Sequence, residues 1–174
     1  NTLKIYSFNQ NSLNLIYQTP FFTNRGVYYV SWRPDGKYLA VGEWYGSFGI
    51  FSFNGTSLSF ISTGPSDFND VNGLSWSPDG NHLAMSLYDS SSPLQSHRIY
   101  YFNGSSLSLK AYTHLGGGRR IQWHPGGQYL ASDTSEGYVY ILKFTGSSID
   151  TIQSISYGTD MWPVGWRSDG NFLC

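Results

Sequence analysis

One pattern recurs four times along this chain of 174 residues, and it constrains the fold more than any other feature. In its second copy, over residues 74–84, it reads Leu-Ser-Trp-Ser-Pro-Asp-Gly-Asn-His-Leu-Ala. The four copies cover residues 30–40, 74–84, 121–131 and 164–174, and their tryptophans are spaced 44, 47 and 43 residues apart. A phenylalanine that precedes a turn recurs with spacings of 45, 49 and 42, at Phe8, Phe53, Phe102 and Phe144. Two anchors that share one period identify an internal repeat.

Each repeat predicts four short strands. In the first complete repeat the expected strands cover residues 28–32, 38–42, 48–53 and 58–62. Between the first two lies Arg-Pro-Asp-Gly at 33–36, where Pro fixes φ, Asp favours a turn and Gly accepts a left-handed conformation. Four antiparallel strands per repeat are typical of a β-propeller blade. We therefore expect an all-β propeller, with Trp32, Trp76 and Trp123 buried between blades.

The motif Trp-x-Pro-Asp-Gly-x-x-Leu-Ala resembles the first hairpin of WD-repeat β-propellers and of the related TolB-like repeats. The resemblance covers essentially the whole chain and implies the fold rather than one function. Phe-Ser at 51–52 and Tyr-Tyr at 100–101 replace the Trp-Asp pair of the family, and the Gly-His pair is missing. The Asp-His-Ser/Thr-Trp hydrogen-bond network of the family is therefore not expected, and the blades should depend on aromatic and aliphatic packing.

The phase of the repeat divides the chain into one propeller unit with a half-blade at each end. We expect an outer half-blade at 1–20, full blades at 21–64, 65–112 and 113–158, and an inner half-blade at 159–174. The two halves could form a composite fourth blade, because propellers avoid exposed sheet edges. Three arrangements stay open: two chains that share blades in an eight-bladed ring, a closed four-bladed monomer, and a piece of a longer propeller. The shared ring is favoured, which predicts a homodimer with Cys174 packed inside a sheet.

Composition narrows the classes of partner. Ten basic and eleven acidic residues give a net charge of −1, so no nucleic-acid partner is expected. A single cysteine excludes an internal disulfide framework and a multi-cysteine zinc site. No apolar run approaches the roughly 20 residues that cross a bilayer, so no membrane association is expected. No signal peptide is visible; the compartment stays open, with the cytoplasm slightly favoured.

No catalytic constellation is visible in the sequence. His82 and His124 fall at tolerant positions of the repeat and are expected to be surface turn residues, and no second ligand lies at a metal-site spacing from either. The aspartates at 35, 79 and 169 are turn residues of the repeat, and no nucleophile elbow or phosphate loop occurs. The sequence therefore predicts neither an enzyme nor a metal or cofactor.

Recognition residues are expected where the repeats differ, on the rim at which the first strand begins and the second strand ends. The candidate binding residues there are Tyr28, Glu43, Trp44, Asp70, Tyr88, Arg119, Arg120, Asp133, Asp160 and Trp162. Exposed Trp, Tyr and Arg are enriched at binding hot spots. Trp44 and Trp162 have a structural alternative, which is packing between blades or in a dimer seam.

These features favour a non-catalytic scaffold that binds an unidentified protein partner. A carbohydrate-binding propeller is the alternative, because sugars stack on Trp and Tyr and hydrogen-bond to Asn and Asp. A propeller hydrolase or lactonase with a central metal is less favoured, because it needs acidic or histidine ligands from most blades.

Overall fold

The structure is a computed structural model that describes residues 2–20, 26–43, 48–64, 70–88, 96–158 and 164–174. Within these ranges the chain forms β-strands and turns, with no helix. An N-terminal hairpin comes first, formed by β1 (Thr2–Phe8) and β2 (Leu13–Pro20). Three four-stranded antiparallel sheets follow, each in the strand order of the sequence.

We call the three sheets blades 1, 2 and 3. Blade 1 comprises β3 (Val27–Trp32), β4 (Tyr38–Glu43), β5 (Phe48–Phe53) and β6 (Leu58–Thr63). Blade 2 comprises β7 (Asp70–Trp76), β8 (His82–Tyr88), β9 (His97–Phe102) and β10 (Leu107–Thr113). Blade 3 comprises β11 (Gly118–Trp123), β12 (Tyr129–Thr134), β13 (Tyr138–Phe144) and β14 (Ile149–Ser156). The predicted all-β fold of four-stranded blades is confirmed.

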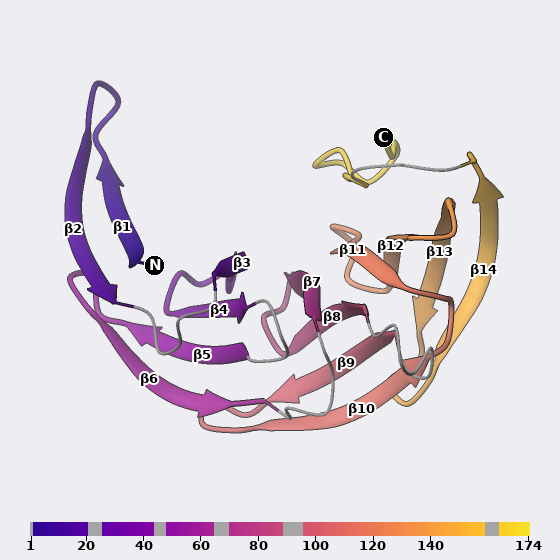
Figure 1. Ribbon diagram of the computed structural model, residues 1–174, viewed down its shortest axis with the longest axis horizontal. Helices are drawn as coiled ribbons and strands as arrows, with labels where there is room; N and C mark the ends of the chain where they lie inside the picture. The colour runs from indigo at the N-terminus through magenta and orange to yellow at the C-terminus, as the bar shows by residue number, and fades with distance from the viewer. Residues whose placement is uncertain (1, 21–25, 44–47, 65–69, 89–95, 159–163) are drawn as a thin grey trace.

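The blades stand side by side along an open arc (Figure 1). The first strands β3, β7 and β11 lie on the inside of the arc, and the last strands β6, β10 and β14 lie on its outside. Residues 164–174, which we call the C-terminal hairpin, contain a bridge between Trp166 and Leu173 and reciprocal backbone hydrogen bonds between Gly165 and Cys174. No helix that could span a membrane is found in the part of the chain described above.

The turn between the first two strands of blades 1 and 2, and the matching turn of the C-terminal hairpin, have the predicted backbone. Gly36, Gly80 and Gly170 have φ angles of 69°, 72° and 77°, in the left-handed region that glycine tolerates best. The aspartate before each glycine stabilises the turn from its side chain; in blade 2, for example, Asp79 Oδ1 accepts a hydrogen bond from Asn81 N at 3.0 Å. The prediction of a left-handed glycine at this position is therefore confirmed.

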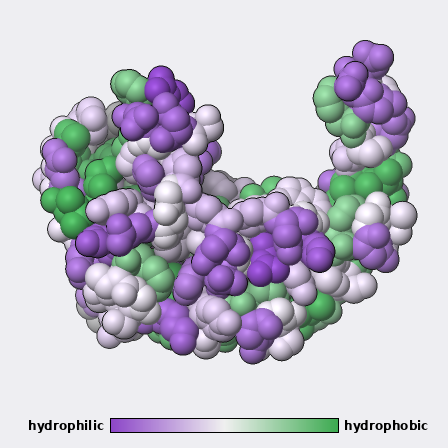
Figure 2. Space-filling model, turned by 180° about the vertical axis from the view of Figure 1, so that it is seen from behind, coloured by the Kyte–Doolittle hydropathy of each residue, from purple (hydrophilic) through white to green (hydrophobic). Residues whose placement is uncertain are grey.

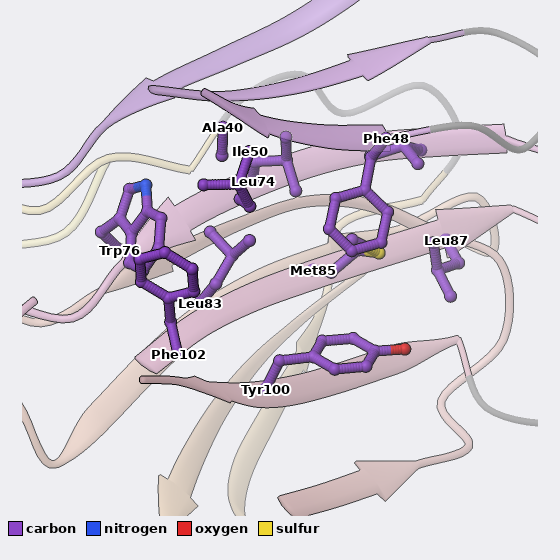
Figure 3. Close-up of a cluster of buried hydrophobic side chains, with 11 residues drawn as sticks. Ala40, Phe48, Ile50, Leu74, Trp76, Leu83, Met85, Leu87, Tyr100 and Phe102 are labelled. Carbon is purple, nitrogen blue, oxygen red and sulfur yellow. The ribbon is translucent and has the colours of Figure 1, made fainter. Parts of the chain in front are cut away.

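The core lies between the blades rather than within one of them. Figure 3 shows the largest cluster, in which Phe48 of blade 1 lies 6.0 Å from Tyr100 of blade 2, measured between ring centroids. Trp76 is 5% exposed, meets Phe102 edge to face at 5.5 Å, and donates its indole N–H to the carbonyl oxygen of Ser31 in blade 1 at 3.1 Å. The expected aromatic and aliphatic packing is what joins neighbouring blades.

The expected burial holds for two of the three tryptophans and is wrong for Trp32. Trp76 and Trp123 are buried against the preceding blade, whereas Trp32 is 42% exposed and meets Phe53 of its own blade edge to face at 5.2 Å. The exposure of Trp32 depends on which part of the chain lies next to it. Blade 1 is preceded only by the hairpin β1–β2, whose Leu3 packs against the outer part of blade 1. No inner strands of a preceding blade cover Trp32 in the described part of the chain.

The arc stays open within one chain. The N-terminal hairpin and the C-terminal hairpin lie on opposite arms of the arc, and Figure 2 shows the same opening in the space-filling view. Among the described strands β1 pairs with β2 alone. The closed four-bladed monomer is therefore not what the structure shows, while the shared ring of two chains and the piece of a longer propeller both stay predictions.

Candidate binding rim

Each innermost strand is interrupted by a β-bulge at the predicted rim position. The register shifts between Val27 and Tyr29 in β3, and between Val71 and Gly73 in β7. In β11 it shifts between Gly118 and Ile121. The residues at the bulges are Tyr28, Asn72, Arg119 and Arg120. A bulge redirects a side chain away from the alternation of its strand, and bulges are common beside functional sites. The residues that the sequence places at these three bulges differ from one blade to the next.

The bulge in β3 presents an aromatic surface beside a shallow pocket. Tyr28 is 50% exposed, and its ring lies 6.0 Å from the ring of Tyr29. Together with Asp70, Val71 and Asn72 of blade 2, Tyr28 lines the pocket. Asn72 is positioned by its side-chain amide, which donates to the carbonyl oxygen of Gly118 in blade 3 at 3.1 Å. Two predicted rim residues, Tyr28 and Asp70, are thus brought together.

Arg120 of blade 3 reaches back toward blade 1. Its guanidinium carbon lies 5.6 Å from the centroid of the Tyr29 ring, in a cation–π arrangement. Its backbone N–H donates to Asp133 Oδ1 at 2.9 Å. Side chains of blades 3 and 1 therefore meet on the inside of the arc.

Asp133 is a buried carboxylate rather than an exposed rim residue. It is 1% exposed, and its Oδ2 has no hydrogen-bond partner among the described residues. Burial raises the pKa of Asp133, although the Arg120 N–H and the charges of Arg119 and Arg120 oppose that rise. Glu43, at the end of β4, is also buried, at 2% exposure. Neither carboxylate is accessible to a partner on the surface described.

The other predicted rim residues differ in position. Tyr88 is exposed at the end of β8 and lies close over Gly117, where an added Cβ would meet its ring at 2.6 Å. Trp44, Asp160 and Trp162 lie outside the described residues. The rim that the structure describes therefore consists of Tyr28, Asp70, Tyr88, Arg119 and Arg120.

The structure also contains a buried polar link that the sequence analysis missed. His97, at the start of β9, is fully buried, with its Nδ1 2.9 Å from Ser96 Oγ and its Nε2 2.6 Å from Ser132 Oγ of blade 3. Ser132 Oγ donates in turn to the carbonyl oxygen of Arg120 at 2.5 Å. A signal was present, because His97 occupies the position of the buried Phe48 in the repeat. A polar residue at a core position requires partners.

His82 and His124, expected as exposed turn residues, are half-buried between blades. The His82 ring meets the Phe144 ring of blade 3 at 5.0 Å, and burial lowers the pKa of His82. His124 lies edge-on to Trp166 at 4.8 Å. The expectation of surface positions is wrong because the turns of successive blades pack against each other. In the described residues no three His, Cys, Asp or Glu side chains are arranged to hold a metal ion.

Comparison with known proteins supports the fold that this geometry shows. A family model, the WD domain, G-beta repeat, matches residues 55–91. Among curated proteins no significant match is found.

Three similar solved structures each share 17% sequence identity with the chain. A candidate 6-phosphogluconolactonase from Bacteroides fragilis has a TM-score of 0.77, with 91% of this chain and 49% of that chain covered. A candidate 6-phosphogluconolactonase from Bacteroides uniformis has a TM-score of 0.78, with 99% and 56% covered. A chain of the mitotic checkpoint complex has a TM-score of 0.75, with 93% and 51% covered.

The chain therefore spans about half the length of the propellers it resembles. At this identity the likeness shows the fold alone. The four-stranded blades and the similar solved structures show a β-propeller fold, and within it residues 55–91 match the WD repeat model.

Proposed function

We propose that the protein is a non-catalytic interaction scaffold that binds a protein partner on the rim formed by the three bulged strands. The observation that carries the proposal is the convergence of side chains from three blades at one place. Tyr28 of blade 1 and Asp70 of blade 2 line one pocket, and Arg120 of blade 3 lies over the ring of Tyr29, the neighbour of Tyr28 in the chain.

The chemistry of this rim suits binding. Tyr28 offers a half-exposed aromatic ring, and the pocket beside it offers the amide of Asn72 and the carboxylate of Asp70. Tyr and Arg are among the residues that contribute most to protein–protein binding, because they combine a large apolar area with polar groups. The buried positions of Asp133 and His97 support this assignment, since neither group is presented to a substrate on the described surface.

The test is a selection of peptides from a random library displayed on phage, with the wild-type protein as bait. Tyr28→Ala should weaken the selected peptides about 30-fold, the loss expected for a hot-spot aromatic residue worth about 2 kcal/mol. Tyr112→Ala is the matched control, because Tyr112 is 49% exposed on the outer strand β10. Equal affinities of both variants for the selected peptides would show that the rim does not bind them.

The lactonase assignment of two similar structures favours a second candidate function, hydrolysis of a sugar lactone. The assay is direct: 6-phosphogluconolactone is added to protein purified without chelator, and hydrolysis is compared with the spontaneous rate. A rate above the spontaneous one that is lost in the Asp70→Asn variant would replace the scaffold proposal with a catalytic one.

The proposal includes self-association. We propose a homodimer in which two open arcs close one ring through shared blades, so that each copy completes the terminal half-blades of the other. The open arc would leave room for the blades of a second copy in one ring (Figure 1).

A further inference from the structure

We propose that the bulge of β11 is a preformed binding site for an acidic side chain of the protein partner, bound by Arg120 and held in shape by a buried network that includes His97. This inference deepens the proposed function and rests on it, because the bulge belongs to the rim. It adds the chemistry of the partner and a positioning residue, His97, that does not itself touch the partner.

The bulge of β11 lacks a backbone pair that the other two bulged strands keep. In blades 1 and 2 the residue after the bulge pairs with the second strand of its blade, as Tyr29↔Gly42 and Gly73↔Ser86. The corresponding residues of blade 3 are Arg120 and Asp133, but the pairing there resumes only at Ile121↔Ser132. The β11 bulge is therefore wider by one pair than the bulges of β3 and β7.

Side chains replace the missing backbone pair. The carbonyl oxygens of residues 118, 119 and 120 each accept a hydrogen bond from a side chain, and the donors are Asn72, Ser86 and Ser132 in that order. The backbone N–H of Arg120 donates to Asp133 Oδ1 at 2.9 Å. The shape of the bulge is thus fixed before a partner arrives, which lowers the entropy cost of binding.

Two members of this network are polar residues at positions that the other blades fill with apolar ones. The position of His97 is held by Phe48 in blade 1 and Val139 in blade 3, and the position of Ser132 is held by Val41 and Met85 in blades 1 and 2. All of these side chains are buried. Phe48 and Met85 belong to one apolar cluster at the junction of blades 1 and 2 (Figure 3).

The polar pair does what an apolar pair cannot do at the next junction. Ser132 Oγ donates to the carbonyl oxygen of Arg120, so it accepts from His97 Nε2–H, at 2.6 Å. His97 thereby directs the Ser132 hydroxyl proton to the bulge. Burial of polar groups costs free energy that an apolar pair would not cost. The support that His97 and Ser132 give to Arg120 accounts for polar residues at these two positions.

Arg120 carries the binding group of this site. It is half-buried, its guanidinium carbon lies 5.6 Å from the centroid of the Tyr29 ring, and its guanidinium group donates no hydrogen bond to the described part of the chain. Contact with an aromatic face orients the guanidinium plane and leaves its N–H groups at the plane edge for a ligand. A carboxylate accepts two parallel N–H bonds from such a group.

The charges at the bulge favour an acidic group as well. Arg119 and Arg120 both act electrostatically on Asp133, so two guanidinium groups face one buried carboxylate there. Because the proposed partner is a protein, its anionic group is an Asp or Glu side chain. The carboxylate of Asp70 lies in the pocket beside Tyr28, so the acidic group of the partner is expected at the bulge and not in that pocket.

The first test concerns the ligand. Peptides selected by the phage experiment should share an acidic residue, and replacing that residue by its amide should weaken binding about 10- to 100-fold, the loss expected for a hydrogen bond between charged groups. Arg120→Gln should weaken the acidic peptide by a similar factor and leave the amide peptide unchanged, because the two changes remove the same contact.

Arg167→Gln is the matched control for charge, because Arg167 is exposed in a turn outside the rim. It should bind the acidic peptide as the wild type does. Selected peptides without a shared acidic residue would overturn the proposal, as would a library that yields no binder. Equal affinities of Arg120→Gln and Arg167→Gln would overturn it too.

The second test concerns the positioning role of His97. The double variant His97→Phe/Ser132→Met reproduces the apolar pair of the preceding junction. Its urea midpoint should equal or exceed that of the wild type, because both polar partners are replaced together. Its affinity for the acidic peptide should nevertheless fall about tenfold, because the bulge loses the donor to Arg120. A purely structural role of His97 predicts unchanged affinity in the folded variant, and that result would overturn the positioning role.

Ser132→Ala guards against misfolding of the double variant, because it removes only the hydroxyl group. It should also weaken the acidic peptide, and unchanged affinity would contradict the network. Tyr28→Ala separates this inference from the proposed function. Peptides weakened by Tyr28→Ala but not by Arg120→Gln would remove the acidic-group site and leave the rim, whereas peptides weakened by neither would remove both.

Discussion

Acidification should destabilise the protein through His97, well above the pH at which its carboxylates titrate. Burial lowers the pKa of His97 to about 4, and the negative charge of Glu136 opposes this only in part. An unfolded histidine has a pKa of about 6.5. Between these values the unfolded chain binds a proton that the folded chain excludes, so the free energy of unfolding falls as the pH falls. The contribution of neutral His97 is complete above pH 6.5 and is lost toward pH 4.

The hydrogen bonds explain why the neutral ring is preferred. Ser132 Oγ donates to the carbonyl oxygen of Arg120, so it accepts from His97 Nε2–H. Ser96 Oγ accepts from the N–H of Leu115 and is free to donate its own proton to His97 Nδ1. This assignment of the tautomer satisfies both ring nitrogens with a single proton. A second proton on Nδ1 would face the hydroxyl proton of Ser96.

The magnitude follows from the difference in pKa. Each pKa unit is worth about 1.4 kcal/mol, so moving from pH 7 to pH 5 should lower the free energy of unfolding by about 2 kcal/mol. The assay is urea denaturation at pH 7, 6 and 5, followed by tryptophan fluorescence. His97→Gln is the matched variant, because its amide can still donate to Ser132 but does not titrate.

His97→Gln should lose stability at pH 7 and lose much less than the wild type on acidification, so the two proteins should converge toward pH 5. Burial raises the pKa of Asp133, which acts in the opposite direction, but Asp133 is common to both proteins and cancels in the comparison. Parallel pH profiles of wild type and variant would refute the assignment of a buried, neutral His97.

Two further predictions concern the framework of the blades. Gly80→Val should lower the free energy of unfolding by about 1 to 3 kcal/mol, because it places a β-branched residue at φ +72° and its Cβ within 2.7 Å of Arg33 Nε. Gly36 has φ +69° but open space around it, so Gly36→Val measures the cost of backbone strain alone. Unchanged thermal or urea unfolding in both variants would mean that the turn is wrongly described. Trp76→Ala should lower the free energy of unfolding by about 3 to 5 kcal/mol, because it truncates a buried core residue. Trp32→Ala, measured in dilute monomer, should lower it clearly less, because the Trp32 ring is 42% exposed. Equal losses in the two variants would contradict the different surroundings of the two rings.

The fold was predictable because each blade is encoded locally. Trp, the Pro-Asp-Gly turn and the Leu-Ala pair recur at one period, and each instance fixes a hairpin through turn geometry and strand alternation. Expected strands such as 48–53 coincide with the observed β5 for this reason. The positions of the bulges were predictable in part, because they fall where the repeats diverge, while the binding role of the rim stays a proposal.

Burial of individual side chains was less predictable, because it depends on which blade lies next to the residue. Trp32 and Trp76 occupy the same place in their repeats and differ only in the neighbour that covers them. Glu43 and Asp133 were placed on the rim because they end strands, yet the chain buries both. His97 stood at a core position without a visible partner, since Ser132 lies 35 residues away in sequence.

The exposure of Trp32 therefore has a different meaning from the exposure of Tyr28, although the two side chains are exposed to a similar degree. Tyr28 sits at a bulge whose counterparts in the other blades are polar, so no repeat position requires it to be buried. Trp32 sits at a position that the chain buries in both other complete blades, against an alanine of the preceding blade. An exposed residue at a variable position indicates recognition, whereas an exposed residue at a framework position indicates an incomplete junction. This difference is why the rim, and not the face of β3, is assigned to a foreign partner.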